Sequence, residues 1–263
     1  MKYNNSLLKK HLTGFIKNQT KKIGIQRAVL GLSGGVDSAV TAYLAVEALG
    51  KENVLCVLMP YKTSSKASIT DALKVVRDLG VRCLTIEITE VVDAYLSKVN
   101  DKEISNIRKG NVMARVRMIT LYDLSARDNA IVIGTGNKTE SLLGYSTIYG
   151  DSACAINAIG DLYKTQVWDL AKYLKVPQSI IDKKPSADLW EGQTDEYEMG
   201  LSYKEVDKYL YNKFDLKKSK SMLIEMGYKK EYIAKVDSMI SKNKFKRYPP
   251  VVCKIPDELK KKQ

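Results

Sequence analysis

The stretch at residues 28–49, AVLGLSGGVDSAVTAYLAVEAL, decides the fold. It opens with an apolar run at 28–32, passes through the loop SGGVDS at 33–38, and continues from about Asp37 with apolar residues at helical spacing. This order indicates a buried strand, a glycine turn and a helix. The turn places backbone N–H groups and the positive end of a helix at one point, an arrangement that binds phosphate.

The sequence on both sides of this stretch alternates between strand and helix patterns. Further apolar runs at 54–59, 81–88 and 130–134 predict three more strands, and helical patterns cover 69–79 and 90–127. Such alternation predicts an α/β fold, a doubly wound parallel sheet with helices on both faces. From residue 164 onward the pattern is mostly helical. We therefore expect one domain over 1–263, with a core at about 25–190 and a helical C-terminal extension at about 191–263, and the segment 186–199 is the best candidate for a mobile loop.

Composition excludes several classes of protein. The chain has 263 residues and is 44% hydrophobic, which is enough for a substantial core. No run approaches the roughly 20 apolar residues that a membrane span needs, and the N-terminus lacks a signal-like apolar region, so we expect a cytoplasmic protein without a membrane partner. Four dispersed cysteines and one histidine argue against disulfide frameworks and zinc sites. The net charge of +13 favours anionic partners, but it does not choose among nucleic acid, a membrane surface and a polyphosphate substrate.

The loop at 33–38 carries side chains that suit a nucleotide. Gly34 and Gly35 permit positive φ and close approach to an anion, Ser33 and Ser38 offer hydroxyls, and Asp37 offers a carboxylate for magnesium. The alternative is a tight turn in which Asp37 or Ser38 only caps the helix. The loop has neither the lysine of G-x-x-x-x-G-K-[ST] nor the spacing of G-x-G-x-x-G.

SGGxDS after the first strand resembles the signature of the ATP pyrophosphatase superfamily, whose members cleave ATP between its α and β phosphates. Within that superfamily the chain resembles the ammonia-dependent NAD synthetases from residue 31 to 250. The segments that carry this resemblance occur in the family's order: KGNV at 109–112, ARVRM at 114–118, GTGNKTE at 134–140, YGD at 149–151, IGDLYKT at 159–165 and KPSADL at 184–189.

The resemblance implies amidation of deamido-NAD to NAD by ammonia through an acyl-adenylate, with release of AMP and pyrophosphate. It also implies ATP as co-substrate, Mg²⁺ as cofactor and a homodimer without a nucleic-acid partner. The chain has no room for a glutamine amidase, so free ammonia or a separate partner is expected. The resemblance implies that Asp37 and Lys164 are catalytic and that Asp37 and Glu140 bind the metal. It implies that deamido-NAD is bound by Arg115, Phe245 and Lys246. The residues that it implies for ATP are Gly31, Leu32, Ser33, Gly34, Gly35, Val36, Asp37, Ser38, Thr135, Lys164 and Ser186.

The residues themselves bear on two of these assignments. Glu140 follows the strand at 130–134 by a short loop, which places it at the same carboxyl edge of a parallel sheet as Asp37. The alternatives for Glu140 are a capping box with Asn137 and simple solvent exposure. Lys164 opens a helix, where a cation opposes the helix dipole unless an anion lies nearby.

Three positions depart from the family pattern, and two rival functions stay open. Ile148 and Ala155 stand where many NAD synthetases carry a lysine and an aspartate toward deamido-NAD, and Leu58 stands where some carry an arginine toward adenine. One rival is a tRNA-modifying ATP pyrophosphatase, for thiolation or lysidine formation, although unpaired cysteines disfavour thiolation. The other is a nucleotide-sensing or tRNA-binding protein without turnover, which the presence of both Asp37 and Glu140 disfavours.

Overall fold

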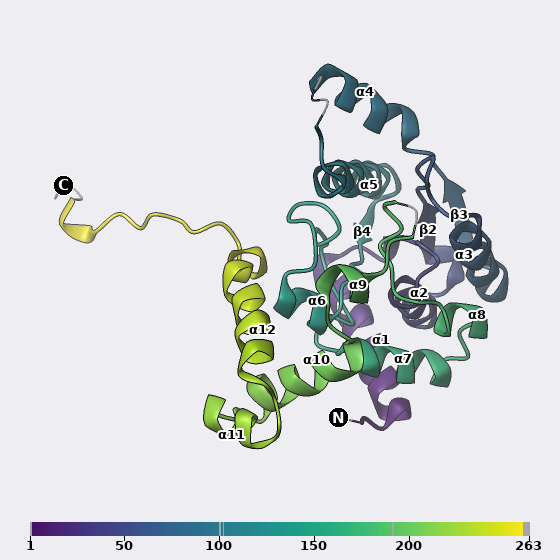
Figure 1. The fold of residues 1–263 in the computed structure, drawn as a ribbon. Coiled ribbons are helices and arrows are strands. Elements are labelled where there is room, and N and C mark those ends of the chain that lie inside the picture. Colours follow the sequence, from purple (N-terminus) through teal and green to yellow (C-terminus); the bar gives the residue numbers. More distant parts are fainter. Residues whose placement is uncertain (1, 100, 102, 191, 260–263) are drawn as a thin grey trace.

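The computed structural model describes residues 2–99, 101, 103–190 and 192–259. Its centre is a four-stranded sheet of β1 (Arg27–Gly31), β2 (Val54–Leu58), β3 (Arg82–Thr85) and β4 (Ala130–Val132) (Figure 1). The strands lie in the order β3-β2-β1-β4, and all neighbouring pairs are parallel. The chain therefore builds outward from β1 in one direction and then crosses to its other side at β4. Ligands of open α/β sheets bind at this reversal, outside the carboxyl ends of the strands.

The four predicted strands are present; β2 is one residue shorter than predicted, and β3 and β4 are shorter by more. β3 ends at Thr85 because the next residues follow β2 past its end, where Ile86 N donates to the Leu58 carbonyl (2.8 Å) and Ile88 N to the Pro60 carbonyl (2.9 Å). β4 ends at Val132, and Gly134 N then turns to the Ile156 carbonyl (2.8 Å).

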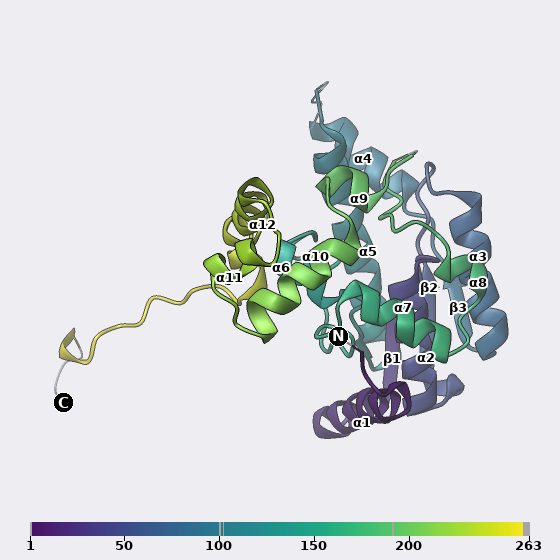
Figure 2. The ribbon, with the colours of Figure 1, turned by 60° about the horizontal axis from the view of Figure 1, so that its bottom comes forward.

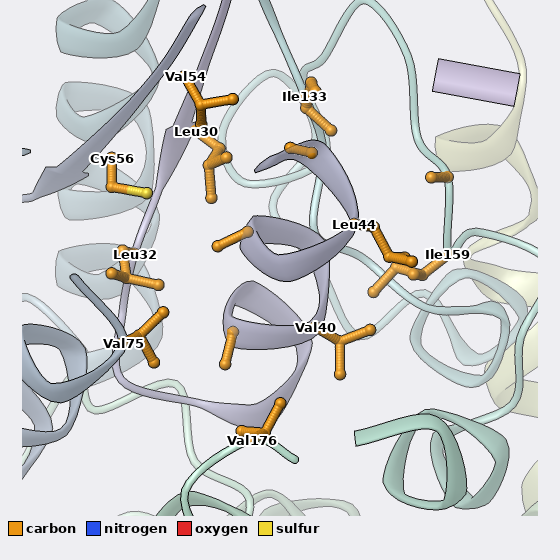
Figure 3. Packing of buried hydrophobic residues seen from close by; sticks show 14 of the residues in the cluster. Leu30, Leu32, Val40, Leu44, Val54, Cys56, Val75, Ile133, Ile159 and Val176 are labelled. Atoms are coloured by element: carbon orange, nitrogen blue, oxygen red, sulfur yellow. The ribbon is translucent and has the colours of Figure 1, made fainter. Parts of the chain in front are cut away.

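Helices cover both faces of the sheet, as predicted. Alternate strand residues such as Leu30 and Cys56 face α1 (Asn5–Ile23), α2 (Val36–Leu49), α3 (Lys66–Leu79) and α7 (Lys164–Tyr173) (Figure 3). The intervening residues, among them Val29 and Val57, face α4 (Thr89–Val99) and α5 (Asn106–Asp128). A single helical region at 90–127 was the wrong prediction, because the chain begins a second helix after Ser105, whose side chain accepts a hydrogen bond from Arg108 N (3.3 Å).

The C-terminal third is helical and has a core of its own. Tyr209, Leu223 and Val236 are buried together there, and α10 (Tyr203–Leu210) joins this group to α6 (Lys138–Leu143) and α7 (Figure 2). The remaining elements are η1 (Lys51–Asn53), α8 (Gln178–Ile181), α9 (Asp195–Met199), the π-turn η2 (Tyr211–Asp215), α11 (Lys220–Glu225), α12 (Lys230–Lys242), η3 (Lys244–Arg247) and η4 (Asp257–Leu259). No helix among the described residues is both long and apolar enough to cross a membrane.

Candidate active site

The loop between β1 and α2 is shaped by one glycine in the left-handed region. Gly34 has φ +78°, and a Cβ added to it would lie 2.1 Å from the Ser68 carbonyl oxygen at the start of α3, so only glycine fits. Gly35 instead has φ −93°, so the positive φ expected at both glycines occurs only at Gly34. Gly35 is the residue that precedes the first turn of α2.

The two loop serines stabilise the turn from inside. The Ser33 and Ser38 hydroxyls are 3.1 Å apart, Gly35 N donates to Ser33 Oγ (3.3 Å), and Ser38 Oγ donates to the Gly35 carbonyl (3.0 Å). No side chain caps the start of α2, so neither Asp37 nor Ser38 serves as the N-cap. The first N–H groups of α2 therefore remain available for an anion.

Three charged side chains meet at the carboxyl edge of β1 and β4. Lys164 Nζ lies 2.5 Å from Asp37 Oδ2 and 3.4 Å from Glu140 Oε1, and the lysine side chain is only 4% exposed. Asn137 Nδ2 donates to the other Asp37 oxygen (2.9 Å). Glu140 also forms the capping box, because its Oε2 accepts from Asn137 N (3.1 Å). The capping box proposed as the alternative for Glu140 is thus present, with one oxygen at the start of α6 and the other facing Lys164, while its role as a metal ligand stays a prediction.

The electrostatics of this cluster favour an added cation. Burial raises the pKa of Glu140, and the nearby Asp37 carboxylate raises it further. Burial lowers the pKa of Lys164, but the carboxylates of Asp37 and Glu140 outweigh it and hold this pKa above its usual value. Asp195 contributes a third buried carboxyl group, whose pKa burial raises. One ammonium group thus faces three carboxyl groups, and burial disfavours the charged forms of Glu140 and Asp195. An added cation would favour those charged forms.

Two cavities meet at this edge of the sheet. The first, of about 410 Å³, is lined by Asp37, Glu140 and Lys164 together with Ser33, Gly35, Val36, Ser38, Thr135, Ser186 and Lys246. The second, of about 250 Å³, is lined by Gly31, Leu32, Ser33 and Thr135 and by the departing residue Leu58. Of the residues expected to bind ATP, only Gly34 lines neither cavity, and its role is to shape the loop. A separate hollow along α1 contains none of the expected site residues.

Arg117 is a candidate site residue that the sequence did not reveal. It lines the second cavity, its Nε donates to the Met59 carbonyl (3.1 Å), and burial lowers its pKa while Asp188 and Asp151 raise it. From the same helix, the sequence analysis singled out only Arg115. The available signal was its position four residues after Met113, which is buried, since residues four apart share a helix face.

The residues expected to bind deamido-NAD are only partly brought together. Lys246 lines the first cavity, where its Nζ donates to the Gly144 and Ser146 carbonyls (2.8 Å each). Arg115 is exposed and donates to the Ile148 carbonyl (3.3 Å), and Phe245 is 61% exposed. Neither Arg115 nor Phe245 lines a cavity described above.

The described part of the segment 186–199 is packed against two helices. Asp188 accepts a hydrogen bond from Ser65 N (2.9 Å) before α3, and Leu189 lies so close to Gly110 of α5 that an added Cβ would meet it at 2.7 Å. Ser186 Oγ accepts from Asp188 N (3.0 Å). Mobility of this segment stays a prediction.

Comparisons with known proteins point to one family. The NAD synthase family model matches residues 8–250. An NH(3)-dependent NAD(+) synthetase of Fusobacterium nucleatum is 52% identical over 244 residues, which cover 93% of this chain and 94% of that protein. A solved NH3-dependent NAD synthetase of Campylobacter jejuni, in complex with the nitrate ion, has a TM-score of 0.81 and 38% identity and covers 96% of this chain and 100% of its own. A solved NMN synthetase of Francisella tularensis has a TM-score of 0.87 and 33% identity with the same coverage.

Proposed function

Because the chain belongs to the NAD synthase family, we propose that it amidates the nicotinate carboxylate of deamido-NAD with ammonia and ATP, and releases NAD, AMP and pyrophosphate. The single observation that carries this proposal is the cluster of Asp37, Lys164 and Glu140 beside the phosphate loop. The named relatives favour this reaction over tRNA modification, since those named above all carry the name of a synthetase that makes NAD or NMN.

The chemistry has two steps. A carboxylate is a poor acceptor for ammonia, so one nicotinate oxygen first attacks the α-phosphorus of ATP, the bond to the bridging oxygen breaks, and pyrophosphate leaves. Ammonia then attacks the carbonyl carbon of the acyl-adenylate, AMP leaves, and one proton is released. The N–H groups that open α2 and the Lys164 ammonium lie where they can stabilise the charge of the leaving pyrophosphate. Catalysis then depends mainly on positioning and charge.

The carboxylates of Asp37 and Glu140 fit Mg²⁺ in chemistry and in number. Magnesium is usually bound by one or two carboxylates together with substrate phosphates and water. Within the described chain, no group of three or more histidine, cysteine or acidic residues is arranged to hold a metal ion. When bound, the ion supplies neutralisation of the phosphate charge.

The second substrate is proposed to bind near Lys246, Arg115 and Phe245. Only Lys246 lines the first cavity, and the exposure of the other two supports a site that a second copy of the chain completes. We therefore include a homodimer in the proposal. Because a similar solved structure is titled NMN synthetase, and Ile148 and Ala155 depart from the deamido-NAD pattern, nicotinate mononucleotide is the competing acceptor to test.

One assay tests the proposal. The protein is incubated with ATP, Mg²⁺, ammonium and either deamido-NAD or nicotinate mononucleotide, and the amide product and pyrophosphate are measured. We expect NAD and pyrophosphate in equal amounts, loss of both with EDTA, and loss of both in Asp37→Ala. The control is Glu47→Ala, which removes an exposed carboxylate from the other end of the same helix. Pyrophosphate release that tRNA stimulates, without NAD above the Asp37→Ala background, would contradict the proposal.

A further inference from the structure

We infer that Asp207, on α10 of the helical C-terminal region, is a positioning residue that sets the places of Lys164 and Glu140 together. The inference rests on the proposed function, since it concerns the same ATP site. Asp207 lies 68 residues after Thr139 and 42 after Thr165, yet it contacts both. The helical C-terminal region thus contacts two segments that carry expected ATP-site residues of the α/β core.

The contacts form a short chain of hydrogen bonds. Thr139 Oγ1 donates to Asp207 Oδ1 (2.5 Å), and Lys164 N donates to Thr139 Oγ1 (3.0 Å). The second Asp207 oxygen accepts from Thr165 N (2.8 Å). Asp207 and Thr139 are both fully buried, at 0% exposure, so no water competes for these bonds.

This arrangement fixes two backbone segments at once. Lys164 and Thr165 are the first residues of α7, where the Gln166 side chain accepts from Tyr163 N (2.9 Å). The Asp207 carboxylate, from another helix, accepts the Thr165 N–H of this first turn and has the favourable charge for a helix N-terminus. Thr139 directly precedes Glu140 in α6. A single side chain therefore holds the start of the lysine's helix against the helix that carries the proposed metal ligand.

The same face of α10 also contacts the lysine side chain. Tyr203 lies four residues before Asp207, so the two share a helix face, and the Lys164 ammonium lies 5.2 Å from the Tyr203 ring centroid. The Tyr203 hydroxyl donates to Asp195 Oδ2 (3.0 Å), the third carboxylate near the lysine. Asp207 thus sets the lysine backbone while Tyr203 borders its ammonium group.

A purely structural role and a positioning role predict different kinetics. If Asp207 only stabilised the fold, its loss would lower the melting temperature and leave the folded fraction active. A positioning residue instead changes the placement of Lys164 and Glu140, which touch ATP and its metal but not the second substrate. The substitution should then weaken ATP binding and lower kcat/KM for ATP. A misplacement of about 1 Å can lower a rate on the order of a hundredfold.

The test compares Asp207→Asn with Asp237→Asn. Asp237 is an acidic residue of the same helical region that accepts a hydrogen bond from the Tyr209 hydroxyl (2.7 Å) and pairs with Lys213, away from α7. For each variant we would measure thermal unfolding, ATP binding by calorimetry with Mg²⁺, and steady-state NAD formation. For Asp207→Asn we expect about a 30- to 100-fold fall in kcat/KM for ATP, weaker ATP binding, and a KM for deamido-NAD within about twofold of wild type. Asp237→Asn should leave the ATP parameters within about twofold.

Three outcomes decide the inference. Folded Asp207→Asn with wild-type ATP binding and kcat/KM would overturn it, and so would an equal loss in Asp237→Asn. If Asp207→Asn does not fold, Thr139→Val and Thr139→Ser replace it: the valine should lose ATP affinity and the serine, which keeps the hydroxyl, should recover most of it. Because ATP binding is measured directly, the comparison stays decisive even if wild type makes no NAD, which would instead refute the proposed function.

Discussion

Replacing Gly34 by alanine should disable the ATP site while leaving the protein folded. Gly34 has φ +78°, where an alanine is disfavoured by roughly 1–2 kcal/mol. In addition, the new Cβ would lie 2.1 Å from the Ser68 carbonyl oxygen, whereas real Cβ atoms are essentially never found within 3.0 Å of another heavy atom. The loop and the start of α3 must therefore move apart by about 0.9 Å, the difference between those two separations.

That displacement would move the first N–H groups of α2. A shift of about 1 Å in a catalytic arrangement can cost on the order of 10²-fold in rate, equivalent to about 2.7 kcal/mol. We therefore expect kcat/KM for ATP to fall about 100-fold. The free energy of unfolding should fall by the backbone strain plus part of the repulsion, about 2–3 kcal/mol.

Gly24→Ala is the matched control. Gly24 ends α1 with the same φ of +78°, but an added Cβ there would meet no atom within 4 Å. The control therefore carries the strain without the clash, and it should lose roughly 1–2 kcal/mol of stability with normal kinetics. Steady-state kinetics at varied ATP and urea unfolding of both variants check this. Wild-type kcat/KM for ATP in Gly34→Ala, or an equal kinetic loss in Gly24→Ala, would refute the reasoning.

Two further predictions concern the charged groups of the site. Burial raises the folded-state pKa of Glu140 above its usual value, so the folded protein holds this proton more tightly than the unfolded chain does. The free energy of unfolding must therefore fall as pH rises from about 4.5 through the raised pKa. The fall is at most about 1.4 kcal/mol per pH unit. Glu140→Gln should flatten this decline in urea unfolding measured at several pH values while it lowers turnover, and parallel profiles for the two proteins would contradict the assignment. Arg117→Met keeps an unbranched stem but removes the guanidinium group, and it should raise the KM for ATP about tenfold with little change in the KM for deamido-NAD. Arg117→Lys should not restore the KM, because lysine lacks the Nε–H that binds the Met59 carbonyl. An unchanged KM for ATP in Arg117→Met would remove Arg117 from the nucleotide site.

The parts of the site that local sequence could predict are those that depend on neighbouring residues and on sheet topology. The loop at 33–38 follows a buried strand and precedes a helix, so its position was determined within one short segment. Glu140 follows the strand on the other side of β1, and the parallel sheet brings that strand's carboxyl end to Asp37. Lys164 begins a helix as expected. A cation at a helix start needs an anion nearby, and the two carboxylates lie close to it.

The parts that could not be predicted depend on contacts between distant segments. Nothing near Asp207 marks it as different from other acidic residues on a helix, because its partners Thr139 and Thr165 come from two other elements. Arg117 was not singled out, because its partner is the Met59 carbonyl 58 residues away and nothing local marks that contact. The break before α5 was missed because the apolar spacing continues on both sides of Ser105, while the cap that starts the new helix depends on one hydroxyl. The single domain over 1–263, with its helical extension from about residue 191, stays a prediction, and contacts of α10 with both α6 and α7 support it.

Lys164 is held from two sides, so substitutions on the two sides should not have independent effects on ATP binding. Asp37 holds the ammonium group from the phosphate-loop side, and Asp207 holds the backbone of the same residue through Thr139 from the C-terminal side. Effects of substitutions add when the sites are independent and fail to add when they share a partner. If both contacts are needed to place the ammonium group, losing one already misplaces it, and losing the second then adds little. Asp37→Asn combined with Asp207→Asn should then weaken ATP binding by less than the product of the two single effects, whereas independent roles would give the full product.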